Sequence, residues 1–184
     1  MLSRRHLLLG LGASFAHPVG AFAHSKKFEL DPKYEPQTVQ SWRYLPGTII
    51  VDPGSHFLFL QLPWGKARRY GVGVGRAGLA FKGEAIVGRK AEWPSWTPTA
   101  NMIKREPEKY ARFAKGVPGG PDNPLGSRAL YLYRDGQDTY YRIHGTTEPS
   151  SIGRSVSNGC IRMLNEHVED LYERVSVGDK VVVL

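Results

Sequence analysis

The segment SNGCIRM, residues 157–163, contains the only cysteine of the chain, Cys160. A cysteine attacks as its thiolate, so it needs a base or a cation nearby. His144, thirteen residues before Ser157, can supply that base. Gly159 leaves room for a substrate carbonyl to approach main-chain N–H groups that could form an oxyanion hole. The segment therefore indicates acyl transfer by a cysteine–histidine pair.

An arginine stands two positions after the cysteine. In an extended segment, Arg162 and Cys160 project to the same face, and a guanidinium suits a substrate carboxylate. A plainer alternative exists, because a lone cysteine is commonly a small buried hydrophobe and a lone histidine a satisfied polar residue. The surrounding sequence decides between the two interpretations.

Four segments in the same order resemble the L,D-transpeptidase catalytic domain (YkuD-type), the cysteine enzymes that cross-link or decorate bacterial peptidoglycan. They are EWPSWTP at 92–98 followed by Met102-Ile103, GGPDNPLGSRALYL at 119–132, YRIHGT at 141–146 and SNGCIRM at 157–163. The resemblance covers nearly all of the chain after residue 23. Four ordered matches argue against coincidence.

The resemblance implies a role for each matching residue. The nucleophile falls on Cys160 and the base on His144, whose imidazole would be oriented by the backbone carbonyl of Gly145, so that no aspartate is needed. The residues expected to contact substrate are Arg162, Asn158, Gly159 and Ser157. Arg154 is a further candidate for substrate carboxylates, with a solvated loop cation as the alternative.

One position departs from the family pattern. Many members carry histidine between the serine and the glycine, where this chain has Asn158. An asparagine can only donate or accept hydrogen bonds, so proton transfer would fall to His144.

The family's activity implies attack on an L-to-D peptide bond in a peptidoglycan stem peptide, loss of a terminal D-residue and formation of a thioester. The acceptor amine would come from a second stem, a free D-amino acid or an envelope protein. Two alternatives stay open. A peptidoglycan L,D-carboxypeptidase or amidase would use water at the same site, and a non-catalytic wall-binding module would use Cys160 only for packing.

Residues 1–23 are typical of an export signal, with Arg4-Arg5, an apolar run and a small-x-small site at Ala21-Phe22-Ala23. The arginine pair fits twin-arginine export, and ordinary secretion is the alternative. Either route predicts the periplasm or cell envelope. The apolar run is shorter than the about 20 residues of a membrane span, so no span is expected in the mature protein.

Composition narrows the partners and cofactors. Residues 1–23 contain two arginines and no acid, so their removal lowers the formal net charge from +8 to +6. Such a basic domain suits anionic wall peptides, whereas the scattered positive charge argues against nucleic acid. The histidines lack metal-ligand spacing, so neither metal nor cofactor is expected. A Gly-x-Gly-x-x-Gly match within residues 69–78 is not followed by a helical pattern, which argues against a dinucleotide site.

The expected architecture is mainly β, a sandwich or barrel of mixed sheets with one clear helix in the C-terminal half. Residues 24–46 are predicted to be an extended lead-in and 47–184 the catalytic domain. The aromatic loop with Trp93 and Trp96 could be a lid or part of the core. Asn165 is expected to cap the helix, and His167 to be exposed. Strands are predicted at 48–51, 56–62, 84–92, 129–133, 139–144 and 181–184, and a short helix near 101–105.

Overall fold

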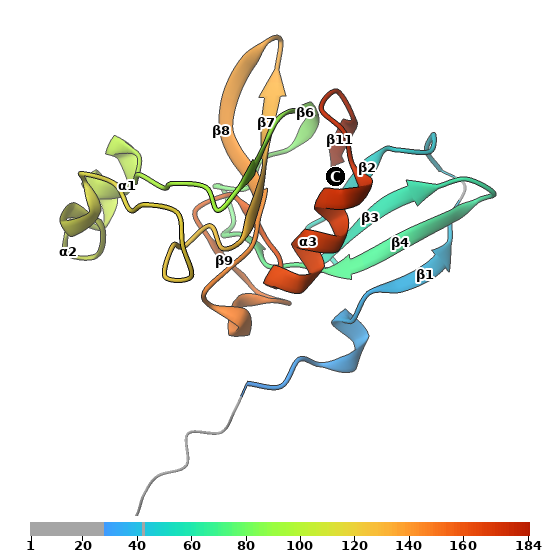
Figure 1. The fold of residues 1–184 in the computed structure, drawn as a ribbon, viewed down its shortest axis with the longest axis horizontal. Coiled ribbons are helices and arrows are strands. Elements are labelled where there is room, and N and C mark those ends of the chain that lie inside the picture. The colour runs from blue at the N-terminus through green and yellow to red at the C-terminus, as the bar shows by residue number, and fades with distance from the viewer. Residues whose placement is uncertain (1–27, 42) are drawn as a thin grey trace, which may run out of the picture.

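The computed structural model describes residues 28–41 and 43–184, so the expected signal segment lies outside the described residues. One nine-stranded sheet dominates the fold (Figure 1). Its strands in spatial order are β1 Gln37–Gln40, β4 Lys66–Gly71, β3 Phe57–Leu62, β2 Ile49–Asp52, β11 Lys180–Val183, β6 Gly83–Glu92, β7 Arg128–Arg134, β8 Gln137–His144 and β10 Ile161–Arg162. A second sheet pairs β5 Val74–Gly75 with β9 Ser155–Ser157.

The sheet is mixed. β11 runs parallel to β2 and antiparallel to β6, and β10 runs parallel to β8, whereas the hairpins β2–β3, β3–β4 and β7–β8 are antiparallel. Parallel neighbours require long crossovers, so the chain leaves the sheet and returns to it. The predicted mainly β class with mixed strands is confirmed.

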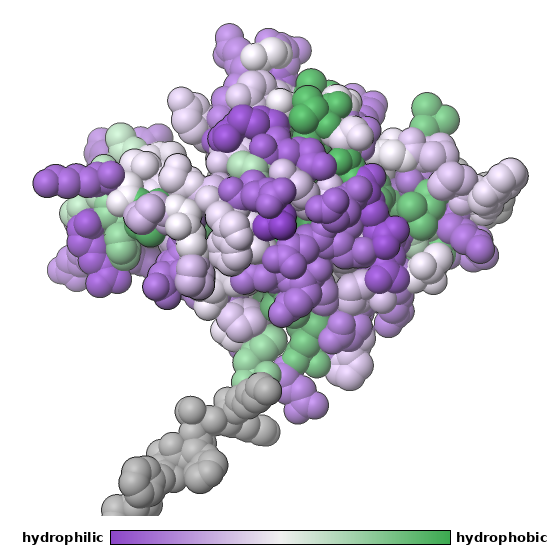
Figure 2. Space-filling view, in the orientation of Figure 1, coloured by the Kyte–Doolittle hydropathy of each residue, from purple (hydrophilic) through white to green (hydrophobic). Residues whose placement is uncertain are grey.

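One apolar core joins the sheet to the helix α3 Asn165–Arg174. In Figure 1, α3 lies between the β3–β4 hairpin and the β7–β8 hairpin. Val168 and Leu171 of α3 are fully buried. Hydrophilic side chains dominate the molecular surface over the middle of the view in Figure 2, which has the orientation of Figure 1. No helix in the described part of the chain is long and apolar enough to cross a membrane.

Two expectations for α3 are wrong. His167 is buried rather than exposed, because Glu35 from the N-terminal segment lies over it with Oε2 3.4 Å from Nε2. Asn165 does not cap the helix: the N-cap is Leu164, and Asn165 is the first helical residue. Its Oδ1 instead accepts a hydrogen bond from the Ser127 N–H at 3.2 Å.

The predicted lead-in contributes structure. It contains the 3₁₀-helix η1 Pro32–Tyr34 and the edge strand β1, which pairs antiparallel with β4. The Tyr34 ring lies 5.5 Å from that of Phe57, centroid to centroid. A Cβ at Gly71 would come within 2.4 Å of Tyr34, and one at Gly153 within 2.5 Å. Tyr34 therefore packs directly on two glycine backbones of the domain.

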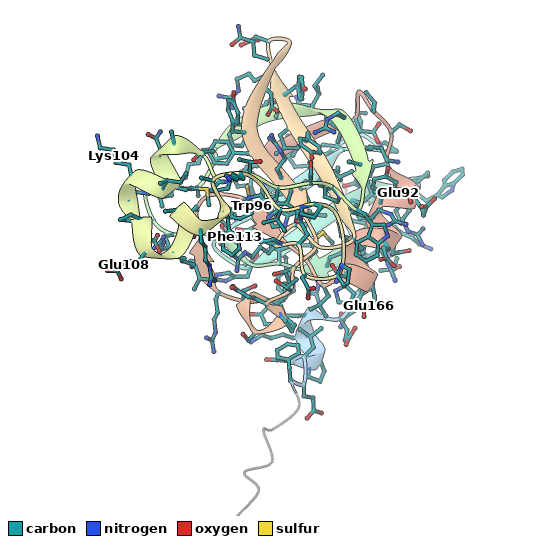
Figure 3. The ribbon with its side chains drawn as sticks, turned by 60° about the vertical axis from the view of Figure 1, so that its left-hand side comes forward. Glu92, Trp96, Lys104, Glu108, Phe113 and Glu166 are labelled. Atoms are coloured by element: carbon teal, nitrogen blue, oxygen red, sulfur yellow. The ribbon has the colours of Figure 1, made fainter. Side chains whose placement is uncertain are left out.

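The aromatic loop leads into a helical segment, defined here as residues 96–117, which stands to one side of the sheet in Figure 1. It contains α1 Ala100–Arg105, α2 Pro107–Tyr110 and the 3₁₀-helix η2 Ala111–Phe113. The Trp96 ring packs edge-on against Tyr110 and Phe113, at centroid distances of 6.2 and 5.8 Å (Figure 3). Trp93 is 47% exposed. Trp96 thus organises a small aromatic cluster of its own, outside the main core.

The glycine-rich stretch lies on β4, β5 and the turn after them, and the next element is β6. A dinucleotide-binding loop would have to open a helix at this point. The glycines of residues 69–78 are therefore strand and turn residues.

Candidate active site

β8 and β10 place the predicted catalytic residues on one face of the sheet. In their parallel register Ile161 lies beside Ile143, and Arg162 beside His144. Both isoleucines are buried in the core, so by alternation His144 and Arg162 belong to the opposite face. Cys160, one residue before β10, lies on that face at the level of Arg142. Cys160 and His144 are thus diagonal neighbours on adjacent strands.

His144 is buried and held by backbone carbonyls. Its Nδ1 lies 2.5 Å from the Gly145 carbonyl oxygen. Burial lowers the pKa of His144 to about 3, and the positive charges of Arg162 and Arg142 lower it as well. Hydrogen bonds to the backbone of Gly145 and Leu125 raise this pKa but do not outweigh the burial. The imidazole is therefore neutral at neutral pH. A proton on Nδ1 directed at Gly145 leaves Nε2 as the basic nitrogen.

Asn165 supports the turn that follows His144. A Cβ at either Gly126 or Gly145 would come within 2.2 Å of the Asn165 Oδ1. The Asn165 amide therefore fills the space between two glycine backbones and fixes the carbonyl that faces His144. Local sequence patterns indicate only a possible helix cap for Asn165, because its contacts here join residues about 20 and 40 positions apart.

Cys160 is half-buried, and its thiol points to β8. Sγ lies 3.9 Å from the Tyr140 carbonyl oxygen, and its hydrogen bonds within the described residues do not include one to His144. Burial raises the pKa of the Cys160 thiol, while the Arg142 backbone and the guanidinium groups of Arg142 and Arg162 act in the opposite direction. A raised thiol pKa beside a lowered imidazole pKa makes the resting pair neutral.

The turn before the nucleophile is closed by Ser157. Its Oγ donates to the Cys160 carbonyl at 2.6 Å and accepts from the Gly159 N–H at 3.1 Å. Gly159 has φ +123°, and a Cβ there would meet the Tyr141 ring at 2.5 Å and the Leu79 carbonyl at 2.6 Å. Only glycine fits this position. The hydrogen bonds found within the described residues do not include one from the Cys160 N–H.

Asn158 connects this turn to the helical segment. Its Oδ1 accepts from Arg76 Nη2 at 2.8 Å and Arg105 Nη2 at 3.3 Å, and its Nδ2 donates to the Tyr110 hydroxyl at 2.8 Å. Arg76 also pairs with Glu106 at 2.7 Å. The amide thus accepts and donates at once, a combination that suits the two arginines and the tyrosine around it.

Of the two candidate arginines, Arg162 lies beside His144 in the strand register, whereas Arg154 lies between η3 and β9. Arg162 Nη1 lies 2.6 Å from Glu148 Oε2, in the loop before the 3₁₀-helix η3 Pro149–Ser151. Arg154 is exposed, and the ion pairs found in the described residues do not include it. Glu148 therefore occupies the place beside Arg162 where a substrate carboxylate would bind.

In residues 28–41 and 43–184, no cluster of three or more histidine, cysteine, aspartate or glutamate side chains is arranged to hold a metal ion.

Comparison with known proteins places this site in a family. The family model of the L,D-transpeptidase catalytic domain, YkuD, matches residues 46–183. The Escherichia coli protein named "Probable L,D-transpeptidase ErfK/SrfK" is 38% identical over 115 residues, which are 61% of this chain and 36% of that protein. The chain thus spans about a third of that relative's length.

Two further relatives are covered over most of their length. YqjB of Bacillus subtilis is 43% identical over 144 residues, 76% of this chain and 73% of that protein. A crystal structure named as a probable carnitine operon oxidoreductase, caia, from Brucella melitensis is 55% identical, with a TM-score of 0.58 over 84% of this chain and 96% of that one. The site described above lies within the region that the family model covers, and the chain belongs to the L,D-transpeptidase catalytic domain (YkuD) family.

Proposed function

We propose that this protein is an L,D-transpeptidase that acts on peptidoglycan stem peptides through a Cys160 acyl-enzyme. The single observation that carries the proposal is the placement of Cys160 and His144 as diagonal neighbours at the ends of β8 and β10, with the His144 Nδ1 turned to the Gly145 carbonyl. This arrangement leaves Nε2 as the base beside a thiol, which is what nucleophilic acyl transfer requires.

The first half-reaction makes the thioester. The thiol turns from Tyr140 toward His144, whose Nε2 takes the S–H proton as Sγ bonds to the carbonyl carbon of an L-to-D peptide bond. The oxyanion faces the N–H of Cys160. When the C–N bond breaks, the imidazolium returns the proton to the leaving amine, and the terminal D-residue departs.

The second half-reaction releases the acyl group. An acceptor amine loses a proton to His144 and attacks the thioester carbon, and the sulfur leaves as a thiol after taking that proton. The amine would belong to a second stem, a free D-amino acid or an envelope protein. Water in its place gives a free carboxylic acid, which is the L,D-carboxypeptidase reaction. We place the enzyme in the periplasm or cell envelope because residues 1–23 are typical of an export signal.

Arg162 is the proposed anchor for a substrate carboxylate, since it is the cation on the site face closest in register to His144. Ser157 and Gly159 shape the turn that presents the nucleophile, and Asn158 ties that turn to the helical segment. A carboxylate on the substrate would have to replace Glu148 on Arg162.

The experiment is intact-mass spectrometry after exposure to a carbapenem, a β-lactam that acylates a competent nucleophile. We expect one adduct on the wild type, none on Cys160→Ala and a much slower reaction for His144→Gln. Circular dichroism of each variant checks that the fold is kept. Absence of an adduct on folded wild type would favour the non-catalytic wall-binding alternative.

A second assay separates transfer from hydrolysis. The protein is incubated with a tetrapeptide stem and a free D-amino acid of different mass. We expect the exchanged tetrapeptide as the main product. A tripeptide alone, with no incorporation at any amine concentration, would establish a carboxypeptidase at the same site.

A further inference from the structure

β8 carries a bulge next to the nucleophile. Across the β7–β8 pairing, Tyr131 lies beside Arg142 and Tyr133 beside Asp138. Two steps along β7 therefore correspond to four steps along β8, and the extra residues are accommodated between Asp138 and Arg142. Bulges of this kind redirect side chains and backbone groups near active sites.

The side chains of Asp138 and Thr139 hold the bulge in place. Asp138 Oδ1 accepts from the Tyr140 N–H at 2.7 Å. Thr139 Oγ1 accepts from the Tyr141 N–H at 3.2 Å and donates to the Leu132 carbonyl at 2.6 Å. Tyr140 itself has φ +62°, a left-handed conformation that a non-glycine residue keeps only when its surroundings impose it.

The bulge also brings Asp138 onto Arg142. Residues four apart in a regular strand are separated by about 13 Å. Here Arg142 Nη1 and Nη2 donate to Asp138 Oδ1 and Oδ2 at 2.7 and 2.8 Å, a two-pronged ion pair. The guanidinium stacks 4.2 Å from the centre of the Tyr131 ring, and both members of the pair are largely buried.

The bulge places two groups next to the Cys160 thiol, the Tyr140 carbonyl and Arg142. The Tyr140 carbonyl is the acceptor 3.9 Å from Sγ, and Arg142 lies beside Cys160 in the register of β8 and β10. His144 on β8 and Arg162 on β10 are further neighbours of Cys160 in the strand register, and Glu148 is paired with Arg162. The Tyr141 ring packs against Gly159, the residue before Cys160. Among the described residues, Asp138 is therefore the carboxylate that contacts both the Tyr140 backbone and the Arg142 guanidinium.

We propose that Asp138 is a positioning residue of this site. Its carboxylate fixes the bulge that aims the Tyr140 carbonyl at the Cys160 S–H, and it holds and neutralises the Arg142 guanidinium, so that together with burial it keeps the resting nucleophile stored as a thiol. The inference rests on the proposed function, because a stored nucleophile matters only if Cys160 reacts with substrate.

The charge and the geometry can be separated by two substitutions. Asp138→Asn keeps an oxygen for the Tyr140 N–H but removes the charge opposite Arg142. Asp138→Ala removes both. The matched control is Asp135→Asn, the same change of charge on the exposed turn of the same hairpin, where φ is +51° and asparagine is well tolerated.

The readout is the rate of Cys160 alkylation by iodoacetamide between pH 5 and 10, followed by intact mass. Because Arg142 would then stabilise the thiolate, we expect Asp138→Asn to react about threefold or more faster at pH 7 and its profile to move to lower pH. Asp135→Asn should follow the wild-type profile. Hydrogen exchange at the Tyr140 and Tyr141 amides should be unchanged in Asp138→Asn and faster in Asp138→Ala.

Profiles that coincide for wild type and Asp138→Asn would overturn the proposal, and so would equal shifts in Asp138→Asn and Asp135→Asn. If Asp138→Ala does not fold, Asp138→Asn carries the test alone. Alkylation does not depend on the acyl-transfer chemistry. The two proposals can therefore fail separately. If carbapenems do not acylate the wild type but Asp138→Asn still shifts the pH profile of alkylation, the proposed function is wrong and the positioning role of Asp138 stands.

Discussion

Arg162 holds Glu148 with its Nη1 2.6 Å from the Glu148 Oε2, and the two partners differ in exposure. The arginine side chain is 18% exposed and the glutamate 59%. The buried member is thus a fixed cation, and the exposed member is a carboxylate that can leave toward solvent. An acidic substrate would compete with Glu148 for the same guanidinium.

This competition gives a prediction for Glu148→Gln. Removing the internal carboxylate should lower KM for a stem tetrapeptide several-fold and change kcat little, because only the bound state gains a free cation. Arg162→Gln should raise KM by about tenfold or more, the cost of one charged hydrogen bond. Steady-state kinetics with the tetrapeptide measure both, and Arg154→Gln, at the exposed arginine between η3 and β9, is the matched control. An effect of Arg154→Gln equal to that of Arg162→Gln would contradict the assignment.

The neutral resting pair predicts a distinctive pH dependence of the wild type. Burial raises the pKa of the Cys160 thiol and lowers that of His144, so neither group is charged at pH 7. Iodoacetamide should therefore alkylate the folded protein more slowly at pH 7 than the same protein in urea, with a rate that keeps rising at alkaline pH. A rate that is flat from pH 5 to 8 would reveal a thiolate–imidazolium pair instead.

The contacts of Asn158 predict coupling between the nucleophile turn and the helical segment. Asn158→Ala removes three hydrogen bonds that reach Arg76, Arg105 and Tyr110. Hydrogen exchange should accelerate across residues 100–113, while β3 and β4 keep their protection. Asn101→Ala, an exposed asparagine on α1, serves as the control. Unchanged exchange in Asn158→Ala would show that the aromatic cluster alone holds the segment.

The close packing of Tyr34 predicts non-additive stability effects. A Cβ at Gly153 would lie 2.5 Å from the ring carbons and the hydroxyl of Tyr34, so Gly153→Ala should be strongly destabilising. Tyr34→Ala should cost about 2 kcal/mol, as expected for a half-buried aromatic side chain. The double substitution should be less destabilising than the sum, because the alanine methyl then enters the space left by the ring. Urea unfolding of the four proteins measures the coupling, and strict additivity would contradict the contact.

The sequence predicted those features that depend on local patterns. Alternation and turn residues identified β2, β3, β6, β7 and β8, and helical spacing identified α3. The cysteine and the histidine could be named from their motifs, and the structure brings them together on one face. Their roles remain proposals that the acylation experiment tests.

Features that depend on distant residues escaped prediction. His167 is buried by Glu35, which lies more than 130 residues earlier in the chain. The Asn165 amide is used by Ser127 rather than by the helix end. The bulge in β8 brings Asp138 into contact with Arg142. The alternation of side chains could not predict this contact, because alternation assumes a regular strand.

The position of β11 has a consequence for biosynthesis. Lys180–Val183 follows both of its neighbours, β2 and β6, in the chain, yet it lies between them and joins the two halves of the large sheet. Until it emerges, the halves have unpaired edges and cannot merge through their central seam. Unpaired edges invite association with other chains. The large sheet therefore cannot close during synthesis until residues 180–183 have been made.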